Sequence, residues 1–112
     1  LATIAQEELP VKVFILNNQF LGMVRQWQEL FYEKRYSYTA LTHSPDFAKV
    51  AEAYGITGMR IKHTGEMLST LEAALVHQGP VVVDCRVCME ENVYPMVPAG
   101  KGLDEMLGLG GQ

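Results

Sequence analysis

Two adjacent amides, Asn17 and Asn18, follow an apolar run at residues 11–16 and are the side chains best placed for chemistry in this sequence. The run is rich in β-branched residues and suits a central strand of a parallel sheet. Ligands of open α/β sheets bind outside the carboxyl ends of such strands. Asn18 can supply one neutral oxygen to Mg²⁺, which takes few protein ligands together with phosphate oxygens and water. An ordinary Asn-Asn turn is the alternative interpretation.

A glycine-punctuated helix is predicted directly after these amides, over about residues 20–34. Gly22 allows the backbone to pass close to a ligand before the helix begins, because glycine has no side chain to clash. The helix carries an apolar stripe, and on periodicity alone a stripe at this spacing faces a core. The stripe consists of Met23, Trp27, Leu30 and Phe31, and Trp27 is the only tryptophan of the chain.

Cys85 and Cys88 form a C-x-x-C pattern, which also occurs in zinc half-sites and redox pairs. The predicted strand over 80–88 alternates its side chains between two faces, so a separation of three residues directs the two thiols apart. The sequence contains no other cysteine. We therefore expect a structural or incidental role for both, and two free thiols suit a reducing compartment.

The three histidines show no spacing suited to a metal, and we expect surface or capping roles for them. They are His43, His63 and His77, the last of which suits a helix C-terminus. We also expect three basic residues of the first half to be solvated or interface charges. They are Arg25, Lys34 and Arg35.

Helical and strand periodicities alternate along the chain, which predicts an α/β fold with a partial doubly wound parallel sheet and flanking helices. Ser44 is expected to cap a helix that Gly55 closes. Thr64 is expected to cap another, with Leu68, Leu71 and Leu75 at helical spacing. The predicted strands lie at 11–17, 56–62 and 80–88. Residues 1–88 are predicted to form the α/β part and 89–112 an irregular tail of the same domain.

Composition excludes several classes of protein. The 112 residues include 48% hydrophobic and 20% charged residues, which is normal for a globular α/β core. The net charge of -4 supplies no basic field for nucleic acid. No apolar stretch approaches the roughly 20 residues of a membrane helix. No G-x-G-x-x-G follows a strand, which disfavours a nicotinamide-binding domain.

A long string of residues resembles the cofactor-binding C-terminal domain of the acetohydroxyacid synthase (acetolactate synthase) large subunit. The resemblance extends from Leu1 to the tail near Leu109. The motifs that carry it are Asn17-Asn18, Leu21-Gly-Met-Val, Gln26-Trp27-Gln28, Phe31-Tyr32, Arg35-Tyr36-Ser37 and the tail Tyr94-Pro-Met-Val-Pro-Ala-Gly-Lys-Gly-Leu-Asp-Glu105.

The resemblance implies a thiamine diphosphate (ThDP) and magnesium site. In the family the asparagine pair closes a metal motif that opens with Gly-Asp-Gly, which this chain lacks, so we expect a truncated chain whose aspartate lies upstream of Leu1. The implied metal ligands are Asn18 and the backbone carbonyl of Phe20. The implied cofactor contacts are Asn18, Phe20, Leu21, Gly22, Met23 and Val24. Trp27 and Met23 are implied to line the pocket of the second 2-ketoacid.

By the same resemblance, the activity is decarboxylation of pyruvate and transfer of the hydroxyethyl group to a second 2-ketoacid in branched-chain amino acid biosynthesis. The resemblance further implies FAD bound mainly outside these residues, a homodimer or tetramer with active sites at the subunit interface, and a regulatory small subunit. The location is the bacterial cytoplasm or a eukaryotic organelle. No catalytic residue is expected in this segment, which alone is expected to be inactive and prone to aggregate.

Other enzymes of the superfamily remain alternatives: a catabolic acetolactate synthase, a pyruvate oxidase or a glyoxylate carboligase. Gln26-Trp27-Gln28 favours the anabolic type. A non-catalytic ThDP-like module is a further alternative of a different class.

Overall fold

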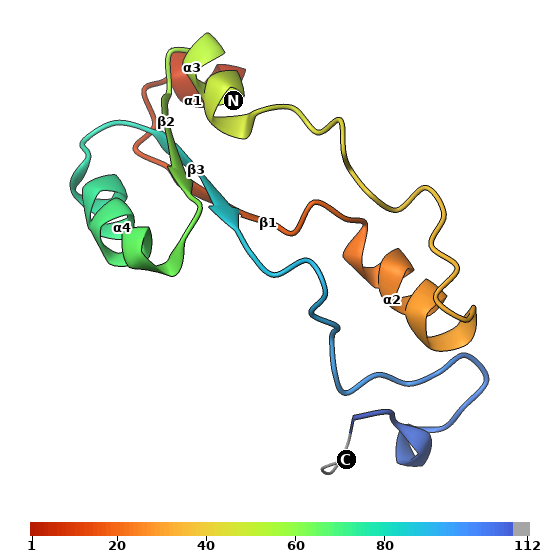
Figure 1. Cartoon of the computed structure of the whole chain (residues 1–112). Helices are drawn as coiled ribbons and strands as arrows, with labels where there is room; N and C mark the ends of the chain where they lie inside the picture. Colours follow the sequence, from red (N-terminus) through yellow and green to blue (C-terminus); the bar gives the residue numbers. More distant parts are fainter. Residues whose placement is uncertain (109–112) are drawn as a thin grey trace. The chain divides into compact units, whose positions relative to one another are not determined.

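Three parallel strands form one sheet in the computed structural model, which describes residues 1–108 (Figure 1). The order is β1 (Lys12–Asn17), β3 (Val81–Arg86) and β2 (Thr57–Ile61), and both pairings are parallel. The predicted partial doubly wound sheet is therefore confirmed, with strands slightly shorter than predicted. The strand latest in the sequence lies in the centre and is the most buried, as expected for a run of valines covered on both faces.

One face of the sheet packs against α1 (Ala2–Gln6) and α3 (Phe47–Ala53). Its core contains Ala51, Ile56 and Val82, which are at most 2% exposed. Gly58 of β2 lies directly beneath α3, where a Cβ would stand 2.8 Å from the Cα of Ala48. Glycine therefore permits the close contact between this helix and the sheet.

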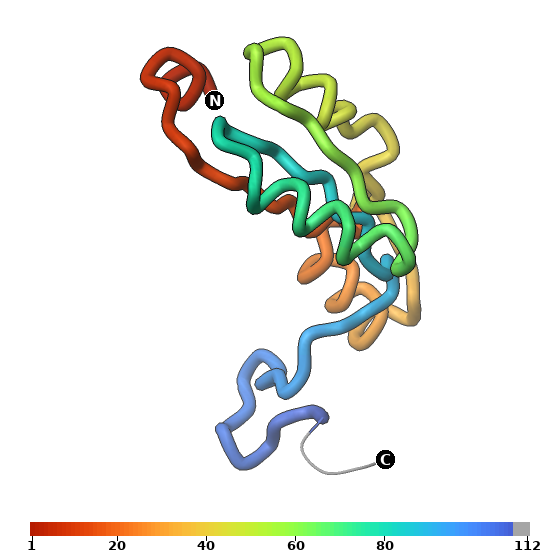
Figure 2. The backbone as a smooth tube through the Cα atoms, turned by 90° about the vertical axis from the view of Figure 1, so that its left-hand side faces the viewer, coloured from red at the N-terminus to blue at the C-terminus, as the bar shows by residue number. Residues whose placement is uncertain are grey.

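The other face packs against α4 (Met67–Val76), which Figure 2 shows running alongside the strands. Val81 and Val83 of β3 and Ala74 of the helix itself are fully buried where the two meet. On the same face Leu16, at the far side of the sheet, is 74% exposed. The helix thus covers the half of this face formed by β2 and β3 and leaves the apolar end of β1 uncovered.

Two local predictions about helix caps are wrong. Asp46, not Ser44, caps α3, because its carboxylate accepts a hydrogen bond from the Lys49 N–H at 3.2 Å. A 3₁₀ turn η1 (Thr64–Glu66) precedes α4, so Thr64 lies within the turn. The three leucines predicted at helical spacing lie in α4, where Leu71 packs against the core and Leu68 and Leu75 are 69% and 65% exposed.

The predicted ends of two elements are confirmed. Gly55 follows the C-cap of α3 with φ of 72°, the left-handed conformation that glycine adopts without steric cost. His77 is the C-cap of α4, and its ring contacts the Thr57 hydroxyl and accepts a hydrogen bond from the Gly79 N–H at 3.0 Å. The capping role expected for His77 is therefore the one observed.

The chain divides into two compact units. One comprises residues 1–19 and 41–88 and contains the sheet. The other comprises residues 20–40 and the chain from Met89 onward, with α2 (Gly22–Phe31), a 3₁₀ turn η2 (Leu103–Glu105) and an isolated bridge between Met96 and Leu107. The assignment of 89–112 to the same domain as 1–88 stays a prediction, and its last four residues lie outside the described part. Within residues 1–108, no helix has the length and apolar character needed to cross a bilayer.

Candidate functional site

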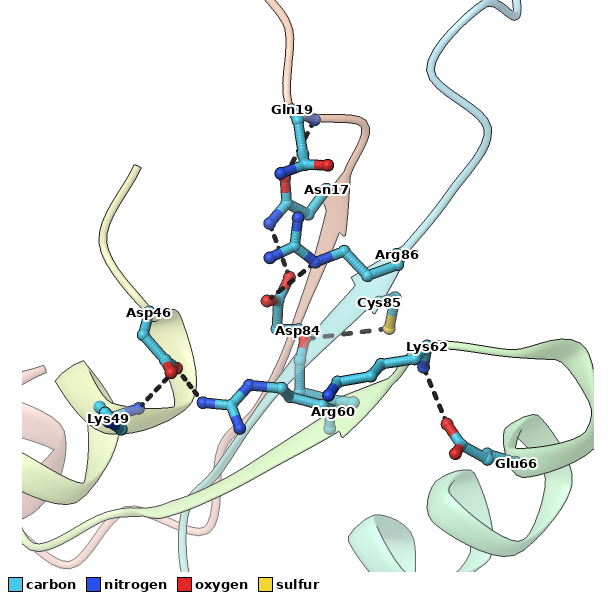
Figure 3. A network of polar contacts seen from close by, with 11 residues as sticks. Asn17, Gln19, Asp46, Lys49, Arg60, Lys62, Glu66, Asp84, Cys85 and Arg86 are labelled. Carbon is cyan, nitrogen blue, oxygen red and sulfur yellow. Dashed lines mark hydrogen bonds and ion pairs between the residues drawn. The ribbon is translucent and has the colours of Figure 1, made fainter. Parts of the chain in front are cut away.

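The turn after β1 is held by the side chain of Asn17, which is 8% exposed. Its Nδ2 donates a hydrogen bond to Oδ1 of Asp84 at 2.8 Å, and its Oδ1 accepts one from the Gln19 N–H at 3.0 Å (Figure 3). Gln19 has φ of 59°, in the left-handed region. The backbone of Gln19 thus has a conformation that is uncommon for residues with a side chain, and the hydrogen bond to Asn17 supports it.

Asn18 lies half-buried in this turn at the carboxyl end of β1, where the sequence predicts it. The chain on either side is fixed by backbone hydrogen bonds. The Leu41 N–H donates to the Gln19 carbonyl, and the Leu21 N–H donates to the Thr39 carbonyl, each at 2.8 Å. Between them Phe20 forms an isolated antiparallel bridge with Ala40. The segment that carries both predicted metal ligands is thus held by a second stretch of chain.

The donors at this turn fit magnesium. An amide oxygen of Asn18 and the backbone carbonyl of Phe20 are hard oxygen ligands, and Mg²⁺ usually takes only one or two protein ligands beside phosphate oxygens and water. Among residues 1–108, no group of three or more His, Cys, Asp or Glu side chains is placed to hold a metal ion. Asn18 and Phe20 both already have interactions within the chain.

The first turn of α2 follows directly and contains the other predicted cofactor contacts. Leu21 is the N-cap, and its side chain makes no capping hydrogen bond to the helix. Gly22, Met23 and Val24 are the first three helical residues. The N–H groups of a first helical turn have no intrahelical partners, and the helix dipole favours anions there. This arrangement suits a phosphate near the start of the helix.

Trp27 lies at an open hollow rather than in a core of its unit. The tryptophan is 39% exposed and meets Phe31 edge to face, with ring centroids 5.7 Å apart. Met23, on the same stripe, is 57% exposed. The hollow has a volume of about 710 Å³ and is lined by Met23, Val24, Trp27, Gln28, Tyr32 and Arg35. The pocket-wall role of Trp27 and Met23 stays a prediction.

Arg25 is 8% exposed, so of its two predicted roles the solvated charge is wrong and the interface charge stays a prediction. Its guanidinium lies 5.2 Å from the ring centroid of Phe20 and 4.7 Å from that of Tyr36, and it forms an ion pair with Glu29 at 3.0 Å. A planar guanidinium can stack on aromatic rings while its N–H groups bind a carboxylate, and these partners offset its burial. Burial and the nearby Glu29 raise the pKa of Tyr36 above its ordinary value, although Arg25 opposes them. Lys34 and Arg35 are exposed, as predicted.

Gln26 connects α2 to the tail, a role that the sequence analysis missed. The side chain is 1% exposed, its Nε2 donates to the Val93 carbonyl at 2.8 Å, and its Oε1 accepts from the Val93 N–H at 3.0 Å. Its Nε2 also lies 3.2 Å from the Met96 sulfur. Farther along, Pro98 and Ala99 of the tail line a second hollow that Trp27 shares. The tail therefore forms part of the surroundings of the tryptophan.

Asp84 is the second polar residue that the sequence analysis missed. It is 1% exposed, follows three buried valines in β3, and lies 3.5 Å from the Arg86 guanidinium in addition to its bond with Asn17. A charged residue inside an apolar strand run is the signal that could have found it, because a buried carboxylate needs partners.

The two cysteines are free thiols in different surroundings. Cys85 is half-buried beside the core under α4, and burial, followed by the charge of Asp84, raises the pKa of its thiol above the ordinary value. Cys88 lies exposed beyond the end of β3. A buried thiol with a raised pKa is less reactive, which agrees with the structural role expected for Cys85.

Comparisons with known proteins identify the family of this chain. Residues 1–85 match the family described as "Thiamine pyrophosphate enzyme, C-terminal TPP binding domain". The chain is 50% identical to the acetolactate synthase large subunit of Pyropia yezoensis over 97% of its length, which is 19% of that protein. It is 45% identical to the mitochondrial acetolactate synthase of Schizosaccharomyces pombe over 96% of its length and 16% of the relative. The chain thus spans less than a fifth of the length of these two relatives.

A solved structure supports the fold. A thiamine diphosphate-dependent 4-hydroxybenzoylformate decarboxylase from Rhodococcus jostii RHA1 matches 80% of this chain and 17% of its own, with a TM-score of 0.70. At 24% sequence identity, this likeness bears on the architecture alone.

The contact between Gln26 and Val93 gives a testable prediction. In the whole polypeptide that carries this sequence, Gln26→Leu removes both hydrogen bonds to Val93 while nearly conserving volume. We expect the opening free energy of the tail around Val93 to fall by about 1 to 3 kcal/mol, because two hydrogen bonds are lost and each contributes about 0.5 to 1.5 kcal/mol. Native-state hydrogen exchange of the Val93 amide measures this opening free energy.

Gln78→Leu is the matched control, because Gln78 is exposed and far along the chain from both partners. Unchanged protection of the Val93 amide in Gln26→Leu contradicts the assigned role of Gln26.

Proposed function

This chain belongs to the thiamine pyrophosphate enzyme family, as a C-terminal TPP-binding domain, and from that membership we propose that the polypeptide carrying it is an acetolactate synthase. Such an enzyme decarboxylates pyruvate and joins the hydroxyethyl group to a second 2-ketoacid. The observation that supports this most is the 50% identity to an acetolactate synthase large subunit across nearly the entire chain. The turn at Asn18 supports the same proposal, because its oxygens suit a magnesium ion at the carboxyl edge of the sheet.

We propose that Asn18 and the backbone carbonyl of Phe20 would hold Mg²⁺, which would neutralise charge on the diphosphate of ThDP. The first turn of α2, from Leu21 through Gly22, Met23 and Val24, then lies against the cofactor. When bound, ThDP supplies the electron sink for loss of carbon dioxide and for formation of the new carbon–carbon bond. The residues of this chain hold the diphosphate, fix its orientation and form an apolar wall. None of them is assigned a proton-transfer step.

Trp27 and Met23 are proposed to select the second 2-ketoacid. Both line the open hollow beside α2, and an indole face offers a large apolar contact. Pyruvate and 2-ketobutyrate differ by one methylene, and one methylene in an apolar pocket discriminates by about 1 to 3 kcal/mol. A contact of the indole with the terminal methyl group is sufficient for a preference of this size.

The remaining features of the proposal concern the whole protein. They are FAD bound mainly outside these residues, a homodimer or tetramer with active sites at the subunit interface, and a role in isoleucine and valine biosynthesis. The term "large subunit" in the name of the Pyropia relative supports a partner small subunit, to which we assign a regulatory role. The location is the cytoplasm of a bacterium or an organelle of a eukaryote, and the name of the Schizosaccharomyces relative supports the organellar option.

A product assay tests the activity. The whole polypeptide receives ThDP, Mg²⁺ and FAD, first with pyruvate alone and then with 2-ketobutyrate added. We expect acetolactate in the first case and a preference for acetohydroxybutyrate in the second. Acetolactate without that preference identifies the catabolic type. No ketoacid product despite bound ThDP identifies another reaction of the superfamily or a non-catalytic module, and overturns the proposal.

The role of Trp27 gives a second prediction. Trp27→Leu removes the indole face, so we expect the ratio of acetohydroxybutyrate to acetolactate to fall about tenfold or more. Turnover with pyruvate alone should fall less, because the first substrate does not depend on the extra contact. Competition between the two 2-ketoacids measures the ratio.

Tyr38→Leu serves as the control, because Tyr38 is fully exposed and does not line the hollow. An unchanged product ratio in Trp27→Leu contradicts the assignment of Trp27.

A further inference from the structure

We propose that Asp84 is a positioning residue for the magnesium-binding turn and that it acts through the side chain of Asn17, without touching the metal or the cofactor. The inference rests on the proposed function, because it concerns the same site. It adds a residue from the central strand, far along the chain from the predicted ligands.

The sheet places Asp84 where one face changes from apolar to polar. Asp84 is paired in register with Ile15 of β1 and Arg60 of β2, and Val82, two residues earlier on the same face, is part of the core. Figure 3 shows the polar side chains gathered at this end of the strands. The carboxylate is thus the first polar group beyond Val82 on this face of β3, two residues before Arg86, which is paired with Asn17.

The chemistry of a carboxylate fixes the orientation of the Asn17 amide. An ionised carboxylate only accepts hydrogen bonds, so the neighbouring amide must direct its nitrogen toward Asp84 and its oxygen the other way. The observed contacts follow this rule, with Nδ2 on Asp84 at 2.8 Å and Oδ1 on the Gln19 N–H at 3.0 Å. Without Asp84 the side-chain amide of Asn17 is free to rotate by half a turn. Its nitrogen would then face the Gln19 N–H, and the hydrogen bond would be lost.

The bond to Gln19 determines the conformation of the residue between them. Asn18 is enclosed between the fixed side chain of Asn17 and Gln19, whose φ of 59° is uncommon for a residue with a side chain. A local side-chain acceptor stabilises such a turn. Asp84 therefore supports, through Asn17, the backbone that presents the amide of Asn18.

Of the two cations nearby, Arg60 has a partner of its own and Arg86 pairs with Asp84 itself. Arg60 forms an ion pair with Asp46, the N-cap of α3. Arg86 lies 3.5 Å from Asp84 and its side chain is 36% exposed. The six register pairs of β1 with β3 already join the two strands. Neither the strand pairing nor these ion pairs orient the side chain of Asn17. That orientation is the contribution of Asp84.

The test compares Asp84→Leu with Asp84→Asn in the whole polypeptide. Both substitutions remove the same negative charge and nearly conserve volume, but only asparagine keeps an oxygen that accepts from Asn17. Calorimetric titration of Mg²⁺ at saturating ThDP gives the affinity without reference to turnover. We expect Asp84→Leu to weaken Mg²⁺ binding about 10- to 100-fold, as loss of a residue that orients a ligand typically does. Asp84→Asn should restore most of the affinity.

Two further variants separate positioning from general effects. Asp46→Asn removes a negative charge beside Arg60 at the far end of the network. We expect this variant to bind Mg²⁺ as tightly as the unsubstituted protein does. Asn17→Ala should weaken Mg²⁺ binding like Asp84→Leu, and the double variant should be no weaker than either. Asn17→Ala also carries the test if Asp84→Leu does not fold, since it leaves Asp84 beside Arg86.

A second readout follows the turn itself. Without cofactor, hydrogen exchange of the Gln19 amide should accelerate in Asp84→Leu and stay slow in Asp84→Asn. Equal Mg²⁺ affinity in Asp84→Leu and the unsubstituted protein overturns the inference, as does Asp84→Asn binding as weakly as Asp84→Leu. Failure of the unsubstituted protein to bind Mg²⁺ with ThDP overturns instead the proposed function, while exchange at Gln19 still tests the effect of Asp84 on the turn.

Discussion

The parallel register between β1 and β3 is the constraint on which the rest of the candidate site depends. It ends both strands at the same edge, with Asn17 beside Arg86 and two residues beyond the position paired with Asp84. A shift by one residue would exchange the faces of β1 and turn Ile15 and the Asn17 amide away from their partners. The packing of Val13 and Ile15 on the core under α1 and α3 therefore also fixes the polar contact that shapes the turn.

The second unit is stabilised by polar residues more than by an apolar core. The buried residues of α2 are Arg25 and Gln26, whereas Met23, Trp27 and Phe31 of its apolar stripe are exposed. Arg25 contacts Tyr36 of the connection that follows the helix, and Gln26 binds the helix to the tail through Val93. This inversion of the usual pattern leaves Trp27 and Met23 available to a ligand or to further protein.

The sequence predicted the elements that depend on local pattern. The strands, their parallel pairing and the position of Asn18 follow from apolar runs, helical crossovers and the strand-end rule. It failed where partners are distant, since Asp84 and Gln26 each bind residues 67 positions away. Arg25 was predicted to be a solvated or interface charge, and the rings of Phe20 and Tyr36 that flank the buried guanidinium come together only in the fold.

The central claim is that the turn at Asn18 binds the divalent metal that holds the diphosphate. Mn²⁺ can replace Mg²⁺ at oxygen sites, and the electron paramagnetic resonance signal of free Mn²⁺ reports how much is bound. The measurement is Mn²⁺ binding at saturating ThDP by the whole polypeptide with and without the substitution Asn18→Ala. The account predicts tight binding by the unsubstituted protein and a large loss of affinity in Asn18→Ala. Equal affinity in the two proteins would contradict it.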